Sequence, residues 1–234
     1  MKILGIDTAG DTLGLAAVCG GSVLGEMILR APRRASALLP GAADRLLEEL
    51  RLTLADMDAA AVTLGPGSFT GLRIGTALVA GLCHSRRLTP VGVCSTEALV
   101  SSVAVPSGGY ALGALRAGRG AAFAALYRRE EEEDADGHWF PTEVVAPGRR
   151  SVREMEELLA ERVPGGAPVV WVSDSREILP DPGTGVHRAV GVIRPGAVAI
   201  IGGRRIREGR ELSPERIYPQ YMHPSGAEMS RKED

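Results

Sequence analysis

Aromatic side chains and lysines are both scarce in this sequence of 234 residues. Aromatic residues make up 4% of the chain, so a hydrophobic core has to be built from aliphatic side chains. Lys2 and Lys232 are the only lysines, and nearly all positive charge is therefore arginine. Because 27 basic residues are balanced by 29 acidic ones, the composition lacks the excess charge of a broad nucleic-acid surface. Direct RNA binding is not predicted.

The cysteines and histidines exclude several kinds of site. Cys19, Cys83 and Cys94 are odd in number and have no CxxC spacing, so neither a disulfide framework nor a zinc site is predicted. The four histidines form no i, i+4 pair and no HExxH motif, which excludes a metal site carried on one helix. No apolar run is long enough to span a membrane, and Asp7 interrupts any signal-type segment. We expect a cytoplasmic protein with no metal site and no membrane association.

The segment Gly65–Gly75 (GPGSFTGLRIG) holds four glycines between a strand-like run at 59–64 and a helical pattern at 72–83. Ser68 and Thr70 are both suitable N-caps for that helix. A glycine-rich turn before a helix offers backbone N–H groups to an anion, but the same glycines suit a tight turn. The segment lacks the Gly-Lys-Ser/Thr of a P-loop, so both interpretations stay open.

Hydrophobic patterning predicts the order β-β-β-α-β-α-β for the first hundred residues. The segments are 2–7, 13–19, 22–29, 40–50, 59–64, 72–83 and 90–94. A three-stranded antiparallel meander followed by crossovers predicts a mixed sheet. This order is typical of the ribonuclease-H-like lobe of actin-type ATPases and sugar kinases.

The pattern partly restarts after residue 103. Strands are predicted at 110–115, 121–127 and 168–173, with helices from Ser151 to Val163 and from Pro195 to Arg207. We predict a first lobe at 1–103, a divergent second lobe at 104–223 and a flexible tail at 224–234. The acidic run 130–136 is interpreted as a solvated loop tip and is given no role.

The two helices of the first lobe differ on a helical wheel. The first is amphipathic, whereas the second is apolar nearly all round. A helix lying on a sheet needs only one apolar stripe, so the surplus is covered either inside the chain or by a partner chain, and both explanations stay open. The predicted partner interface consists of small and aliphatic residues of these helices: Leu39, Ala43, Leu46, Gly71, Ile74, Gly75, Ala77, Leu78 and Gly81.

Asp7 closes the first strand, the position from which such folds hold a metal–nucleotide complex. The sequence therefore indicates a vestigial nucleotide site of Asp7, Thr8, Gly67 and Ser68, weighed against the common role of Asp as a turn former. No partner motif for a nucleotide is found in the second lobe. Ser68 has no GxSxG context and no recognisable His or Asp partner. No catalytic residue is predicted.

Three motifs resemble those of one family. Ile6-Asp7-Thr8, Leu38-Leu39-Pro40 and above all Gly65–Gly75 are similar to the TsaB family, also called YeaZ. The resemblance covers about residues 1 to 100. It implies an α/β, two-lobed actin-like ATPase (ASKHA) fold with mixed sheets flanked by helices, related to the TsaD threonylcarbamoyl transferase but lacking its histidine metal site.

The resemblance further implies a non-catalytic dimerisation subunit. Such a subunit pairs with TsaD, and with the ATPase TsaE, in making threonylcarbamoyladenosine at position 37 of tRNAs that read codons beginning with A. The two first-lobe helices are then the interface with TsaD, ATP is used only by partner subunits, and tRNA is contacted indirectly. Whether the isolated chain forms a homodimer stays open.

Two rival functions are weighed against this one. The first is an ATP-binding kinase or ATPase of the actin-like fold that uses Asp7 and the Gly-rich loop. The second is a metallopeptidase-like protein, which requires metal ligands that the sequence does not show.

Overall fold

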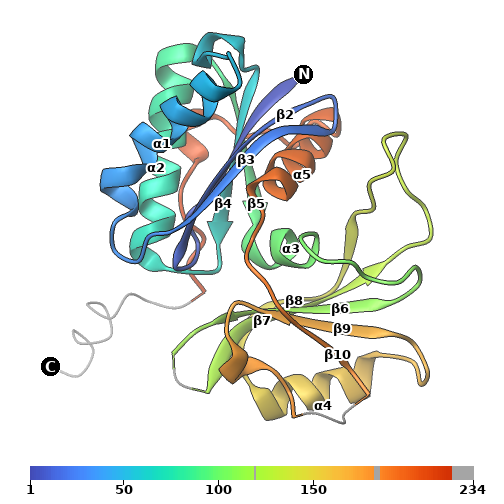
Figure 1. The fold of residues 1–234 in the computed structure, drawn as a ribbon. Coiled ribbons are helices and arrows are strands. Elements are labelled where there is room, and N and C mark those ends of the chain that lie inside the picture. The colour runs from blue at the N-terminus through green and yellow to red at the C-terminus, as the bar shows by residue number, and fades with distance from the viewer. Residues whose placement is uncertain (119, 182–184, 223–234) are drawn as a thin grey trace, which may run out of the picture.

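Two five-stranded sheets, each flanked by helices, make up the chain (Figure 1). The structure is a computed structural model that describes residues 1–118, 120–181 and 185–222. The predicted α/β class with two lobes is confirmed. The predicted tail at 224–234 lies outside the described residues. Within those ranges, no helix combines the length and apolar character that crossing a bilayer requires.

The first sheet has the strand order β3-β2-β1-β4-β5. These strands are Ser22–Arg30, Thr12–Cys19, Lys2–Asp7, Ala59–Gly65 and Thr89–Cys94, respectively. The pairs β1–β2 and β2–β3 are antiparallel, whereas β1–β4 and β4–β5 are parallel. The sheet is therefore the predicted mixed one. Strand β4 is buried along its whole length because both faces of the sheet are covered, which explains its continuous apolar sequence.

Helices α1 (Ala35–Glu49) and α2 (Phe69–Arg86) cover one face of this sheet (Figure 1). Helix α1 begins five residues before the predicted start at 40, and Pro40 lies inside it. The sequence put the start of this helix at about Pro40. In the structure, α1 lacks the hydrogen bond that an N–H at this position would donate to the carbonyl of Ser36.

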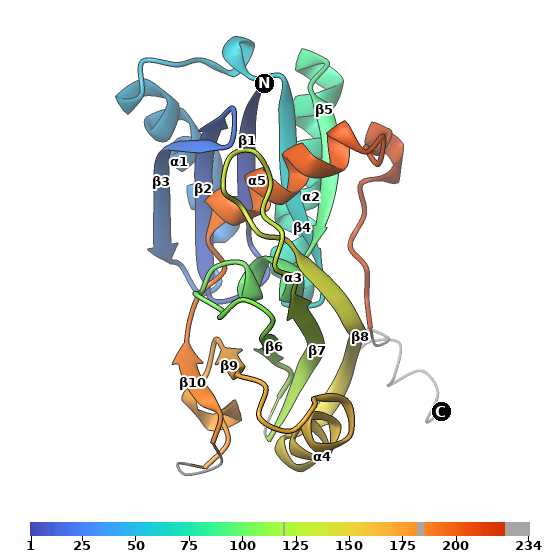
Figure 2. The same cartoon turned by 90° about the vertical axis from the view of Figure 1, so that its right-hand side faces the viewer.

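Helix α5 (Pro195–Arg207) covers the opposite face (Figure 2). Small residues allow a close approach: a Cβ on Gly5 would collide with the carbonyl oxygen of Pro195, and one on Gly202 would lie 2.7 Å from the Cβ of Ala61. The bounds of α5 match the predicted helix. Its sequence segment falls within the predicted second lobe, 104–223, but the helix packs on the sheet of the first lobe.

The second sheet has the order β10-β9-β6-β7-β8. Its strands are His187–Val190, Val169–Ser173, Tyr110–Arg116, Ala121–Arg129 and Pro141–Ser151. From β8 to β10, two antiparallel pairs are followed by two parallel pairs, which repeats the topology of the first sheet. The second lobe is thus a second copy of the same architecture, although its sequence revealed only three of the five strands.

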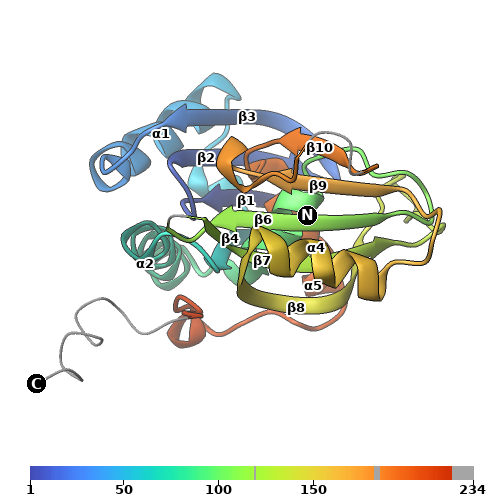
Figure 3. The same ribbon diagram turned by 90° about the horizontal axis from the view of Figure 1, so that it is seen from below.

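Helix α4 (Val152–Arg162) covers the outer face of the second sheet (Figure 3). The predicted capping box is confirmed, because the Ser151 hydroxyl and the Glu154 carboxylate each bond the other residue's backbone N–H. Met155 and Leu159 pack with the fully buried Trp171. Helix α3 (Ser95–Val100) lies on the inner face, where its buried side chains join the cores of the two lobes.

The last described residues, 210–222, run back along the first lobe, and we call them the C-terminal strap. The Leu212 N–H donates to the Pro90 carbonyl at 2.9 Å, and the Gln220 N–H donates to the Leu64 carbonyl at 2.7 Å. Ile217 is buried between these anchors. The strap thereby shields strand β5, which would otherwise be an exposed sheet edge.

Candidate functional sites

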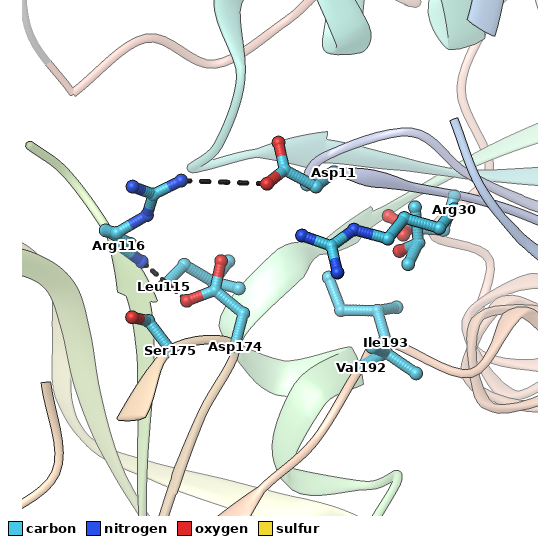
Figure 4. A pocket seen from close by; sticks show the side chains of 11 residues that line it. Asp11, Arg30, Leu115, Arg116, Asp174, Ser175, Val192 and Ile193 are labelled. Carbon is cyan, nitrogen blue, oxygen red and sulfur yellow. Dashed lines mark hydrogen bonds and ion pairs between the residues drawn. The ribbon is translucent and has the colours of Figure 1, made fainter. Parts of the chain in front are cut away.

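A cleft of about 380 Å³ lies between the two lobes. Asp11 comes from the turn between β1 and β2, Arg116 from the end of β6, and Asp174 follows β9 (Figure 4). Arg116 Nη2 lies 3.6 Å from Asp11 Oδ2 across the cleft, and the Arg116 N–H donates to Asp174 Oδ1 at 2.9 Å. The side chain of Arg116 therefore bridges the lobes over the cavity.

Asp7, predicted as the centre of a vestigial nucleotide site, lines this cleft from β1 but is 1% exposed. Its Oδ1 accepts hydrogen bonds from the Thr63 hydroxyl at 2.8 Å and the Ala9 N–H at 3.1 Å. Within the described part of the chain, Oδ2 has no hydrogen-bond partner. Burial raises the pKa of Asp7 to about 6, against the opposing effect of the hydrogen bonds from Thr63 and Ala9.

The actin-like fold implies a magnesium–nucleotide complex in such a cleft, but these side chains do not fit one. Among the residues that the structure describes, no three acidic, His or Cys side chains are grouped so as to hold a metal ion. An anion in the cleft would meet the carboxylates of Asp11 and Asp174 as well as the guanidinium groups of Arg30 and Arg116, and the Arg116–Asp11 pair already spans the space.

The Gly-rich segment faces the chain's own turn between β1 and β2. The Ser68 N–H donates to the Ala9 carbonyl at 2.6 Å, and the Thr8 hydroxyl donates to the Gly71 carbonyl at 2.7 Å. Ser68 Oγ accepts from the Gly71 N–H at 3.2 Å and caps α2, as the sequence predicted. Because the N–H groups of Ser68 and Gly71 are occupied, they are not free to cradle a phosphate.

The glycines of this segment admit neighbouring backbone of the same chain. A Cβ on Gly71 would collide with the Thr8 carbonyl oxygen, one on Gly75 with the Thr8 hydroxyl, and one on Gly67 with the Ala9 carbonyl oxygen. The interpretation of Gly71 and Gly75 as sites where a partner helix approaches is therefore wrong. Thr8 and Gly67 likewise serve the packing of this junction.

The predicted partner interface divides into two groups. Leu39, Ala43, Leu46, Gly71 and Gly75 are buried inside the first lobe. The side chains of Leu39, Ala43 and Leu46 belong to the core between the two helices and the sheet, whereas Gly71 and Gly75 lie against Thr8. Of the other four residues on α2, Ala77 and Gly81 are exposed, whereas Ile74 and Leu78 are half-buried and pack partly against the first-lobe core.

An aromatic cluster that the sequence did not reveal lies at the start of α2. The Phe69 and Tyr221 rings stack with centroids 4.6 Å apart, and the Arg73 guanidinium lies 3.8 Å from the Phe69 centroid. Arg73 Nε donates to the Tyr221 hydroxyl at 2.8 Å. The cluster fixes the end of the C-terminal strap beside α2. No local sequence signal connects Arg73 with a residue 148 positions away.

Comparison with known proteins gives consistent results. Residues 29–145 match the family model described as TsaD: tRNA N6-adenosine threonylcarbamoyltransferase. The tRNA threonylcarbamoyladenosine biosynthesis protein TsaB of Escherichia coli (strain K12) is 29% identical over 233 residues, which cover 95% of this chain and 94% of that protein. The protein of the same name from Bacillus subtilis (strain 168) is 34% identical over 102 residues, 44% of each chain.

A solved structure supports the fold. YeaZ from Pseudomonas aeruginosa superposes with a TM-score of 0.69, covering 94% of this chain and 99% of that one. At 18% sequence identity, this likeness shows a common architecture of two lobes.

Proposed function

Because this chain belongs to the TsaB (YeaZ) family, we propose that it is a non-catalytic subunit in the biosynthesis of threonylcarbamoyladenosine in tRNA. The names of its E. coli and B. subtilis relatives support the pathway. The non-catalytic role is taken from the family resemblance, and the Arg116–Asp11 pair that spans the interlobe cleft is compatible with it. The three cysteines are free, which suits the cytoplasm.

The partner in this proposal is TsaD, and the observation that carries it is the outer surface of α2. Ile74, Ala77, Leu78 and Gly81 form an uncharged strip there, and Ala77 and Gly81 let another helix approach closely. A stable interface needs about 800 Å² on each partner, and on this proposal that area comes from the exposed faces of α1 and α2. The same strip serves self-association of the chain when TsaD is absent.

The subunit acts by association. Binding to one conformation of TsaD more tightly than to others shifts TsaD toward that conformation. TsaE joins the assembly for ATP hydrolysis, and modification takes place at adenosine 37 of tRNAs that read codons beginning with A. On this proposal the chain itself contributes no reacting group, and its α2 interface does not contact tRNA.

Ala77→Arg tests the interface. The exposed position accepts a long side chain without disturbing the core, but burying its charge between two helices is unfavourable. We expect binding to TsaD, measured by calorimetry, to weaken about 100-fold or more, and tRNA modification in a reconstituted system to fall accordingly. The melting temperature of the isolated chain, measured at a concentration at which it is monomeric, stays unchanged.

Ala160→Arg is the matched control, because Ala160 is exposed on α4 in the other lobe. It should bind TsaD as the wild type does. The proposal fails if Ala77→Arg binds TsaD normally, or if TsaD with TsaE modifies tRNA at full rate without this chain.

A further inference from the structure

A second cavity, of about 480 Å³, lies on the first lobe between α5, β5 and the C-terminal strap. We call it the arginine cleft. Three of its lining residues are arginines and none is acidic. The full lining is Leu64, Gly92, Arg205, Arg210, Leu212, Arg216, Tyr218 and Gln220.

The charges of the arginine cleft are only partly compensated. Arg205 forms the floor, where it pairs with Glu97 and donates to the Gly92 carbonyl. Arg210 lies 3.2 Å from Glu208 Oε2, but the other oxygen of Glu208 accepts from Arg204 at 2.6 Å. One carboxylate thus serves two guanidinium groups.

Arg216 has no ion pair with any residue that the structure describes, and its side chain is exposed at the rim. Glu211 and Glu215 lie on the same strap but do not line the cavity. The rim therefore carries one guanidinium without an ion pair to any described residue, that of Arg216, and a second, that of Arg210, which shares the Glu208 carboxylate with Arg204. Both groups have the planar shape that binds the oxygens of an anion bidentately.

The remaining lining residues have a different chemistry. Tyr218 is 61% exposed, which leaves its ring free to stack on a planar group. Leu64 and Leu212 supply an apolar floor, and the exposed Gln220 carries both a hydrogen-bond donor and an acceptor. Guanidinium groups beside an exposed aromatic ring are the combination that holds a nucleotide unit, with phosphate on the arginines and base on the ring.

We propose that the arginine cleft binds a nucleotide phosphate, either of a free nucleotide or of an RNA strand. Arg210 and Arg216 hold the phosphate oxygens, Arg205 adds positive charge from the floor, and Tyr218 stacks on the base. The cavity volume lies within the range of small-ligand sites. This site uses none of the α2 residues assigned to TsaD, so it does not depend on the proposed subunit role.

The test uses the full chain and two probes, magnesium-free ATP and a labelled single-stranded oligoribonucleotide. The double variant Arg210→Ala/Arg216→Ala removes both rim charges. Arg153→Ala/Arg162→Ala on α4 makes the same change of net charge in the other lobe, where both side chains are exposed. Affinities are measured by calorimetry for ATP and by fluorescence anisotropy for RNA, at two salt concentrations.

We expect the wild type to bind at least one probe and the Arg210/Arg216 variant to bind it at least tenfold more weakly, while the α4 variant stays within twofold. Which probe binds identifies the source of the phosphate. Tyr218→Leu should weaken both nucleotide probes but leave the binding of inorganic pyrophosphate unchanged, because only a base stacks on the ring.

Three results overturn the proposal: no binding of either probe, equal loss in the two double variants, or ATP binding lost in Arg116→Ala but kept in the Arg210/Arg216 variant. The last result assigns the nucleotide to the interlobe cleft. The Arg210/Arg216 variant should retain TsaD binding and Ala77→Arg should retain nucleotide binding, so the two proposals can fail independently.

Discussion

Gly71→Ala is expected to lower the melting temperature of the chain by about 6–12 °C. A Cβ at this position would collide with the carbonyl oxygen of Thr8, which is main chain and cannot rotate away. To avoid this collision, the start of α2 has to move away from the β1–β2 turn. That movement breaks the hydrogen bond from the Thr8 hydroxyl to the Gly71 carbonyl. Overpacking of this kind costs about 3 kcal/mol, and each kcal/mol is worth about 2–4 °C in a chain of this size.

Gly81→Ala on the same helix is the matched control. A Cβ there meets nothing within 4 Å, and the residue is exposed. Replacing this glycine should stabilise the helix by about 1 kcal/mol and raise the melting temperature by a few degrees. Thermal unfolding followed by circular dichroism distinguishes the two changes. Similar melting temperatures for both variants would show that the contact between Gly71 and Thr8 is not tight.

Asp7→Asn is expected to change how the free energy of unfolding depends on pH. The pKa of Asp7 is raised to about 6 by burial, above its ordinary value of 3.8. Between these two pH values the folded chain binds more protons than the unfolded chain, so the free energy of unfolding falls as the pH rises. The loss begins near pH 4, is complete above pH 6, and amounts to about 3 kcal/mol.

An asparagine retains the oxygen that accepts from Thr63 and Ala9 but cannot ionise. The difference in unfolding free energy between variant and wild type should therefore move by about 3 kcal/mol in favour of the variant from pH 4 to pH 7, as measured by urea titration. A pH-independent difference for Asp7→Asn would mean that Asp7 is already ionised in the folded chain at pH 4.

Sequence patterning predicted the helices and strands whose signal lies in their own residues. The apolar strand at 59–64 and the capping box of Ser151 and Glu154 are examples, since the signal lies within a few residues. Strands β8 and β10 were missed because their residues are mostly exposed or half-buried and show no apolar alternation. Helix α3 was missed because it has only six residues.

The sites were less predictable than the elements. Gly71 and Ala77 are both small residues of one helix and look alike in sequence. Gly71 nevertheless contacts Thr8, whereas Ala77 faces solvent. That difference depends on which side of α2 meets the sheet. The arginine cleft combines residues from β4, β5, α5 and the C-terminal strap, and no spacing rule connects positions as far apart as Leu64 and Arg216.

Helix α5 has a consequence for how the chain is made. It is the last α-helix of the described chain to leave the ribosome, yet it covers the face of the first sheet that contains Ile3, Ala61 and Val91. Until residue 207 has been synthesised, that apolar face is not covered by α5. The first hundred residues therefore cannot complete their folding before α5 is available. Premature termination anywhere before α5 therefore yields an incompletely folded first lobe with an exposed, aggregation-prone apolar face, as well as a shortened second lobe.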